Sequence, residues 1–173
     1  MDCRRSLKGN DQKASGGIKI MYRVTKTYGN EKGLSCAFRQ WRAQSHCRLI
    51  HGYSLGFRIT LEAEELDERN WVYDFGDMKF IKEFLEKNFD HVLAVAEDDP
   101  ERSTLEALGS EKRRIKDIAN VRIFGNVGCE AFAEYVFSYI WTKVDHETKG
   151  RVRLVSVECF EHGSNSAIYA RKL

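Results

Sequence analysis

One segment constrains the fold of this chain more than any other. Residues 53–62 alternate strictly, with apolar side chains at every second position and polar or small ones between them. The apolar set is Tyr53, Leu55, Phe57, Ile59 and Leu61. A period of two is typical of a β-strand that has one apolar face. The segment therefore predicts a strand with a single buried side.

Other segments predict the remaining elements. Shorter strands are expected at 18–26, 34–39, 71–74, 152–160 and 167–170. Helical spacing replaces the alternation at 76–88 and at 129–143, where apolar stripes recur every three or four residues. Asp74 is a candidate cap for the first of these helices. Residues 97–120 are charged and aperiodic, so they predict a long excursion, of a kind that is often functional or mobile.

Length and composition predict one globular domain. The 173 residues are 42% hydrophobic and 31% charged, which suits a single core at 19–173 preceded by a flexible polar extension at 1–18. A net charge of +2 gives no reason to expect a nucleic-acid or membrane partner. Without an apolar run of membrane-spanning length or an export signal, we expect a cytoplasmic protein with reduced thiols.

Three segments carry groups suited to chemistry. Ser45–Tyr53 places Cys47 close to two imidazoles, His46 and His51, and a thiolate is a good base or nucleophile. Taken alone, however, Cys47 is more typical of a small buried residue, and His51 of a core histidine.

Asp90 and His91 are adjacent, and a carboxylate can orient an imidazole for proton transfer near neutral pH. Alone, such a dipeptide is more often a solvated turn. Glu161 stands at the end of a predicted strand and could accept two N–H bonds from a 2-amino-4-oxo pyrimidine edge, although a solvated edge charge is the simpler interpretation.

Together these segments resemble the tetrahydropterin synthase family, over roughly residues 20–171. Four motifs carry the resemblance in the family's order: Leu34–Arg39 (F-S-A-A-H-R), Cys47–Ser54 (C-x-x-x-H-G-H-S/N), Trp71–Lys79 (hydrophobic-D-F-x-x-L-K) and Phe89–His91 (L-D-H). Weaker matches are Asn126–Glu130 for N-P-T-x-E and Val157–Glu161 for V-x-V-x-E. The joint order is specific, whereas no single string is.

The resemblance implies a fold and residue roles. The fold is an α+β tunnelling T-fold, a four-stranded antiparallel sheet with two helices on one face, assembled into an oligomeric barrel that is usually a homohexamer. Cys47 matches the catalytic thiol, and Asp90 with His91 matches the pair that completes the proton relay. Glu161 matches the carboxylate that anchors the pterin, Glu130 a second substrate-binding carboxylate, and His51 one of three zinc ligands.

The chain departs from the family pattern at the positions of the zinc-binding histidines. Phe38 and Tyr53 replace the other two zinc histidines, and Val127 and Gly128 replace the Pro-Thr pair of the pterin pocket. Zinc could survive through Cys36 and His46 beside His51, a ligand set of suitable chemistry. Alternatively the protein cleaves a pterin side chain without metal, in an aldolase-type reaction, or it is an inactive oligomer that binds pterin.

The acid–base residues are retained although the metal positions changed, which favours an enzyme, a carbon–carbon or carbon–oxygen lyase acting on a pterin. The short Cys47-x-x-x-His51 spacing resembles the bacterial 6-carboxy-tetrahydropterin synthases. Their reaction converts 7,8-dihydroneopterin triphosphate to 6-carboxy-tetrahydropterin, releasing acetaldehyde and triphosphate, on the route to 7-deazaguanines such as queuosine. We expect this chain to catalyse that reaction.

Overall fold

A computed structural model describes residues 20–109 and 118–171. Its strands are β1 (Tyr22–Tyr28), β2 (Leu34–Phe38), β3 (His51–Ala63), β4 (Val92–Ala96), β5 (Asn120–Phe124), β6 (Arg153–His162) and β7 (Asn165–Ala170). Its helices are α1 (Lys79–Phe89), α2 (Arg102–Glu106) and α3 (Cys129–Thr148). The predicted extension at 1–18 lies outside the described residues. Within the described ranges, no helix is both long and apolar enough to cross a membrane.

The alternating segment forms β3, the longest strand and the centre of the fold. Leu55, Phe57, Ile59 and Leu61 are all fully buried. β3 pairs in antiparallel fashion with β2 along its first residues and with β1 along its last. Its pairing with β6, and that of β6 with β7, is also antiparallel. The prediction of a half-buried strand at 53–62 is thus confirmed.

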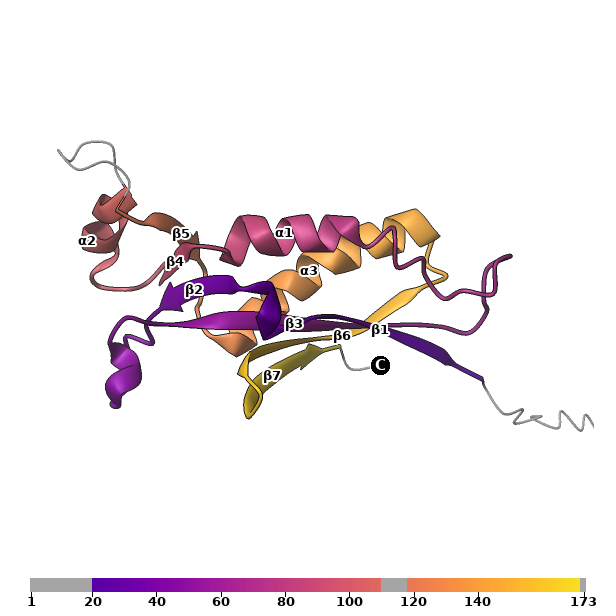
Figure 1. Ribbon diagram of the computed structural model, residues 1–173, viewed down its shortest axis with the longest axis horizontal. Helices are drawn as coiled ribbons and strands as arrows, with labels where there is room; N and C mark the ends of the chain where they lie inside the picture. The colour runs from indigo at the N-terminus through magenta and orange to yellow at the C-terminus, as the bar shows by residue number, and fades with distance from the viewer. Residues whose placement is uncertain (1–19, 110–117, 172–173) are drawn as a thin grey trace, which may run out of the picture.

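Two helices cover one face of the sheet, as expected. α1 and α3 lie side by side on the same side of the strands, and α2 sits at one end beside β4 and β5 (Figure 1). The apolar stripes of both long helices are buried at 0–1% exposure: Ile81 and Leu85 on α1, and Phe132, Val136 and Ile140 on α3. Burying such stripes against the row on β3 forms the main core.

The expected sheet of four antiparallel strands is wrong in number and in direction. The sheet has seven strands in the order β5-β4-β2-β3-β6-β7, with β1 also paired to β3. β4 runs parallel to both β2 and β5. All five residues of β4 are buried, because the main core packs on one side and Leu105 of α2 on the other. A strand buried on both faces shows no alternation, so it gave no periodic signal.

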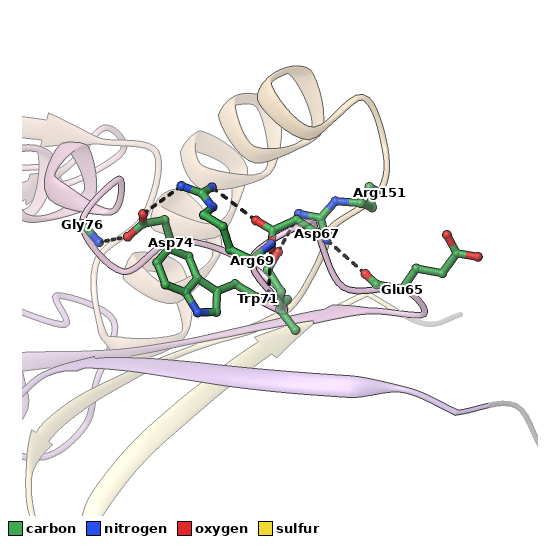
Figure 2. Close-up of polar contacts among 8 residues, drawn as sticks. Glu65, Asp67, Arg69, Trp71, Asp74, Gly76 and Arg151 are labelled. Carbon is green, nitrogen blue, oxygen red and sulfur yellow. Dashed lines mark hydrogen bonds and ion pairs between the residues drawn. The ribbon is translucent and has the colours of Figure 1, made fainter.

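The predicted strand at 71–74 is also wrong, because this segment is part of an irregular loop. Asp67 Oδ1 accepts the backbone N–H groups of Arg69 and Trp71, each at 2.9 Å (Figure 2). Such local side-chain bonds occupy donors that a sheet would need. The predicted excursion at 97–120 contains α2 and the first residue of β5, with 110–117 outside the described residues.

Asp74 does not cap α1 as expected. Its Oδ1 accepts the N–H of Gly76 at 2.7 Å, and its other carboxylate oxygen lies 3.5 Å from Arg69 Nη1 (Figure 2). The helix begins at Lys79, three residues after the predicted start. Asp74 therefore stabilises the loop that precedes the helix.

A buried ion pair fixes the loop that follows β2. Arg39 donates to both carboxylate oxygens of Asp99, at 2.8 and 2.6 Å, and the Asp99 side chain is only 1% exposed. The hydrogen bond from Arg39 lowers the pKa of Asp99. The neighbouring pair of Arg42 and Asp98, at 2.5 Å, is exposed on both sides. The loop is therefore joined to the β4–α2 connection mainly through Asp99.

We expect Asp99→Asn to lower the free energy of unfolding at neutral pH by about 1.5–3 kcal/mol, because charged hydrogen bonds to a buried group are lost. An unfolded aspartate titrates near pH 3.9, and the folded pKa is lower. The pair therefore stabilises the fold above that pH, and its contribution disappears as the pH falls through the folded pKa. Urea unfolding of parent and variant between about pH 7 and pH 3 measures the difference in their free energies of unfolding, which should narrow as the pH falls.

Asp98→Asn is the matched control, since it changes the adjacent carboxylate in an exposed pair. We expect it to cost clearly less than Asp99→Asn, because solvent screens exposed ion pairs. Equal losses of unfolding free energy in the two variants would contradict the stabilising role of Asp99. A difference between parent and Asp99→Asn that does not change with pH would contradict it as well.

Candidate functional site

A cleft of about 400 Å³ opens where β2 ends and β3 begins. Its walls come from the loop after β2, the first residues of β3, the first turn of α3, the end of β6 and β7. Five residues singled out from the sequence line it together: His46, Cys47, His51, Glu130 and Glu161. The chain therefore brings a thiol, two imidazoles and two carboxylates to one concave surface.

Cys47 sits in a 3-10 turn, His46–Arg48, held by hydrogen bonds at both ends. Ser45 Oγ accepts the Cys47 N–H at 3.3 Å. The Cys47 carbonyl accepts the backbone N–H of Gln40 at 2.9 Å. These bonds hold the Cys47 backbone, and the half-buried residue lines the cleft within reach of a ligand.

Gln40 joins two walls of the cleft, and no motif had indicated it. Besides its bond to Cys47, its side-chain amide donates to the carbonyl of Val127 at 2.6 Å. Gly128 follows with a φ of 111°, which favours glycine. A Cβ there would also collide with the Gln40 amide. Glycine at residue 128 thus has a structural reason in this chain.

His51 is oriented by the backbone and packed between aromatic rings. Its Nδ1 lies 2.7 Å from the Leu49 carbonyl, which can only accept, so Nδ1 carries the proton. Its ring centroid lies 5.2 Å from that of Phe38 and 5.5 Å from that of Tyr53. In the neutral ring, Nε2 is then the unprotonated nitrogen.

Tyr53 also lines the cleft, although the sequence indicated it only as a member of the alternating strand and as a replaced zinc ligand. It alternates in register with the buried row of β3 and lines the cleft half-buried. Burial raises the pKa of its phenol, and the charges of Glu161, Cys47 and Cys129 raise it further. Its place in the 53–62 alternation could have indicated this position, because every second residue shares a face.

The substitute zinc ligands do not assemble. Cys36 shares a strand face with Phe38, as expected from their spacing, but it is 1% exposed in the core. Burial raises the pKa of its thiol to about 12, which disfavours the thiolate that zinc binds. Across residues 20–109 and 118–171, no three His, Cys, Asp or Glu side chains are grouped to hold a metal ion. The residues present do not fit the family's zinc.

Asp90 and His91 form a pair, but in a different cleft. His91 Nδ1 lies 2.7 Å from Asp90 Oδ1, and the imidazole is 85% exposed. His91 lines a cleft of about 930 Å³ beside β2, β4 and β5. Neither residue lines the Cys47 cleft. Within one chain, the predicted catalytic residues therefore lie in two places.

The two carboxylates of the Cys47 cleft stand on different elements. Glu130 lies in the first turn of α3, where the helix dipole favours negative charge. Glu161 lies near the end of β6, and its backbone carbonyl accepts a hydrogen bond from Asn30 Nδ2 at 3.2 Å. Glu158, on the same strand, is instead paired with Arg58 at 3.0 Å outside the cleft.

Comparisons with known proteins identify the family of this chain. The family model described as 6-pyruvoyl tetrahydropterin synthase matches residues 28–172. The chain is 24% identical over 157 residues to a 6-carboxy-5,6,7,8-tetrahydropterin synthase of Aquifex aeolicus, covering 86% of this chain and 88% of that protein. It is 36% identical over 59 residues to a Rickettsia felis protein of the same name, covering 34% of this chain and less than half, 43%, of the relative.

Solved structures show the same fold. An uncharacterized protein from Wolinella succinogenes superposes with a TM-score of 0.75 at 20% identity, covering 88% of this chain and 99% of the other. A 6-pyruvoyl tetrahydropterin synthase from Plasmodium vivax gives 0.62 at 13% identity, covering 89% and 99%. Since the family model spans most of the sequence, the chain belongs to the 6-pyruvoyl tetrahydropterin synthase family.

Proposed function

We propose that the protein is a pterin-converting lyase of the 6-carboxy-tetrahydropterin synthase type. It would convert 7,8-dihydroneopterin triphosphate and water to 6-carboxy-tetrahydropterin, acetaldehyde and triphosphate, in the biosynthesis of 7-deazaguanines such as queuosine. The observation that carries the proposal is the cleft where Cys47 meets Glu130 and Glu161. The names of the Aquifex and Rickettsia relatives support this reaction over that of the pyruvoyl enzymes.

In this proposal Glu161 binds the pterin. Its carboxylate accepts two N–H bonds from the 2-amino-4-oxo edge, a charge-assisted bidentate contact. Glu130 provides a second acceptor from the start of α3. The cleft volume of about 400 Å³ lies within the usual range for small-ligand sites. The substrate side chain then extends toward Cys47.

Proton transfer falls to Cys47 and to the Asp90–His91 pair. Cys47 exchanges a proton at the substrate side chain. Asp90 Oδ1 holds Nδ1–H of His91, which leaves Nε2 of the neutral imidazole as the accepting nitrogen. No metal takes part in the proposed chemistry, because the donor set around His51 does not fit zinc.

The two clefts meet only if chains assemble, so the proposal includes a homo-oligomer, with a homohexamer as the family's usual form. Among the described residues, three strands have a single strand neighbour: β1, β5 and β7. None of the described helices covers the sheet face opposite α1 and α3 (Figure 1). Unpaired edges of this kind favour strand pairing with another copy. His91 of one copy would then face Cys47 of the next.

The enzyme is proposed to be cytoplasmic, with a small-molecule substrate.

A metal-free aldolase cleavage of the pterin side chain is the second candidate, favoured by the rings of Phe38 and Tyr53 at the ligand positions. The products distinguish the two reactions. The synthase releases acetaldehyde and triphosphate, whereas aldol cleavage of a trihydroxypropyl side chain releases a two-carbon hydroxyaldehyde.

We expect Cys47→Ala to lower kcat on 7,8-dihydroneopterin triphosphate by about 10²–10⁴-fold, the usual contribution of a positioned acid–base group. Pterin binding should persist, because Glu161 is intact. Chromatography of pterin products and an acetaldehyde assay measure turnover, and fluorescence titration measures binding. Tight binding by the parent without any turnover would contradict the enzyme and favour the inactive binding oligomer.

We expect Glu161→Gln to raise the Kd for the pterin by roughly 10–100-fold, because a charged acceptor contributes about 1.5–3 kcal/mol. Glu158→Gln is the matched control, since it changes a carboxylate on the same strand that is paired with Arg58 outside the cleft. The control should bind the pterin like the parent. Equal effects of the two changes would exclude Glu161 as the anchor.

Co-assembly tests whether the site is shared between chains. Cys47→Ala and His91→Ala chains should each be inactive alone. When they are co-expressed with different tags and purified as mixed oligomers, roughly a quarter of the sites should regain both groups by random pairing. Mixed oligomers that stay inactive, or a parent protein that is monomeric while active, would contradict a shared site.

A further inference from the structure

The family's metal position has a different chemistry in this chain. Phe38 is 2% exposed and packs edge-on against Phe132 at 5.4 Å. Its ring also lies 6.1 Å from that of Tyr53. With His51, these rings form a cluster, here called the aromatic cluster (Phe38, His51 and Tyr53). A catalytic zinc takes three protein ligands, and this cluster offers one imidazole.

Tyr53 brings a new polar group to the same place. Its hydroxyl has no hydrogen-bond partner among residues 20–109 and 118–171, although the residue lines the cleft. Cys47, Cys129 and Glu161 line that cleft with it and act on its phenol electrostatically. An uncommitted donor thus lies among the thiol and the carboxylate assigned to proton transfer and pterin binding.

Two neighbouring donors of the cleft are already engaged. The Nδ1–H of His51 is bound to the Leu49 carbonyl, which leaves a lone pair on the other nitrogen. The amide of Gln40 is bound to the Val127 carbonyl. A phenol with an ordinary pKa near 10 stays protonated at neutral pH and keeps its donor. Tyrosine hydroxyls are among the side chains that stabilise developing oxyanions in enzymes.

We propose that Tyr53 replaces the metal as the electrophile of this site. Its hydroxyl donates a hydrogen bond to the substrate side-chain oxygen that gains negative charge while Cys47 moves a proton. Phe38 and His51 hold the phenol ring in place through the aromatic cluster. This inference rests on the proposed pterin chemistry and names the group that supplies its electrostatic stabilisation.

Tyr53→Phe removes one oxygen and keeps the ring packing. With 7,8-dihydroneopterin triphosphate as the probe, we expect kcat to fall by about 10²–10³-fold, the usual loss for one oxyanion donor. The Kd for the pterin should change by less than about twofold, because the donor acts mainly in the transition state. Tyr139→Phe is the matched control, since Tyr139 stacks on Phe84 at 3.7 Å between the helices and does not line the cleft.

Kinetic measurements distinguish a failure of the Tyr53 role from a failure of the proposed function. If the parent turns the pterin over and Tyr53→Phe retains its kcat, the role of Tyr53 is wrong and the proposed function stands. If the parent neither binds nor converts the pterin, both are overturned. Equal kcat losses in Tyr53→Phe and Tyr139→Phe would also overturn the assignment, because the loss would then not be specific to the cleft.

Metal content gives a readout that does not depend on turnover. The purified parent should hold far less than one zinc per chain, and its activity should survive a chelator. The double variant Phe38→His with Tyr53→His restores three imidazoles and should bind about one zinc per chain. Stoichiometric zinc in the parent, with activity lost on chelation and restored by zinc, would overturn the proposal. If that zinc disappeared in Cys36→Ala or His46→Ala, the substitute ligand set would be identified.

Discussion

The packing of one apolar row on β3 against α1 and α3 underlies both the fold and the cleft. Leu55 to Leu61 fill the core at every second position, and the same alternation continues backward to Tyr53 and His51 at the cleft wall. A shift of one residue in strand register would turn this whole row to the opposite face. The free energy gained by burying the row therefore also fixes which side chains face a ligand.

The sequence was most informative where a single periodicity governed a segment. The alternation of β3 and the stripes of α1 and α3 follow from one-sided burial, and the structure confirms them. β4 could not be found in this way, since both of its faces are covered. The false strand at 71–74 has strand-like composition, yet Asp67 binds two of the backbone N–H groups in its loop. Composition alone does not report that competition.

The structure brings only some of the candidate site residues into one cleft. Cys47, Glu130 and Glu161 converge within one chain, whereas His91 faces a separate cleft. A motif order records the sequence positions of groups and carries no information on whether they meet within a chain or between chains. Tyr53 and Gln40 escaped prediction for different reasons: the first was read as a missing ligand, and the second belongs to no motif. Their roles depend on contacts that only the fold creates.

The contact between Gln40 and Gly128 has an evolutionary consequence. The amide of residue 40 occupies the space that a side chain at residue 128 would need, so the two positions share one volume. A relative with a larger residue at the start of α3 must withdraw or shorten residue 40, and then lacks this bridge between the thiol loop and the helix. A side chain at residue 128 would therefore displace the flexible Gln40 amide and remove its hydrogen bond to the Val127 carbonyl.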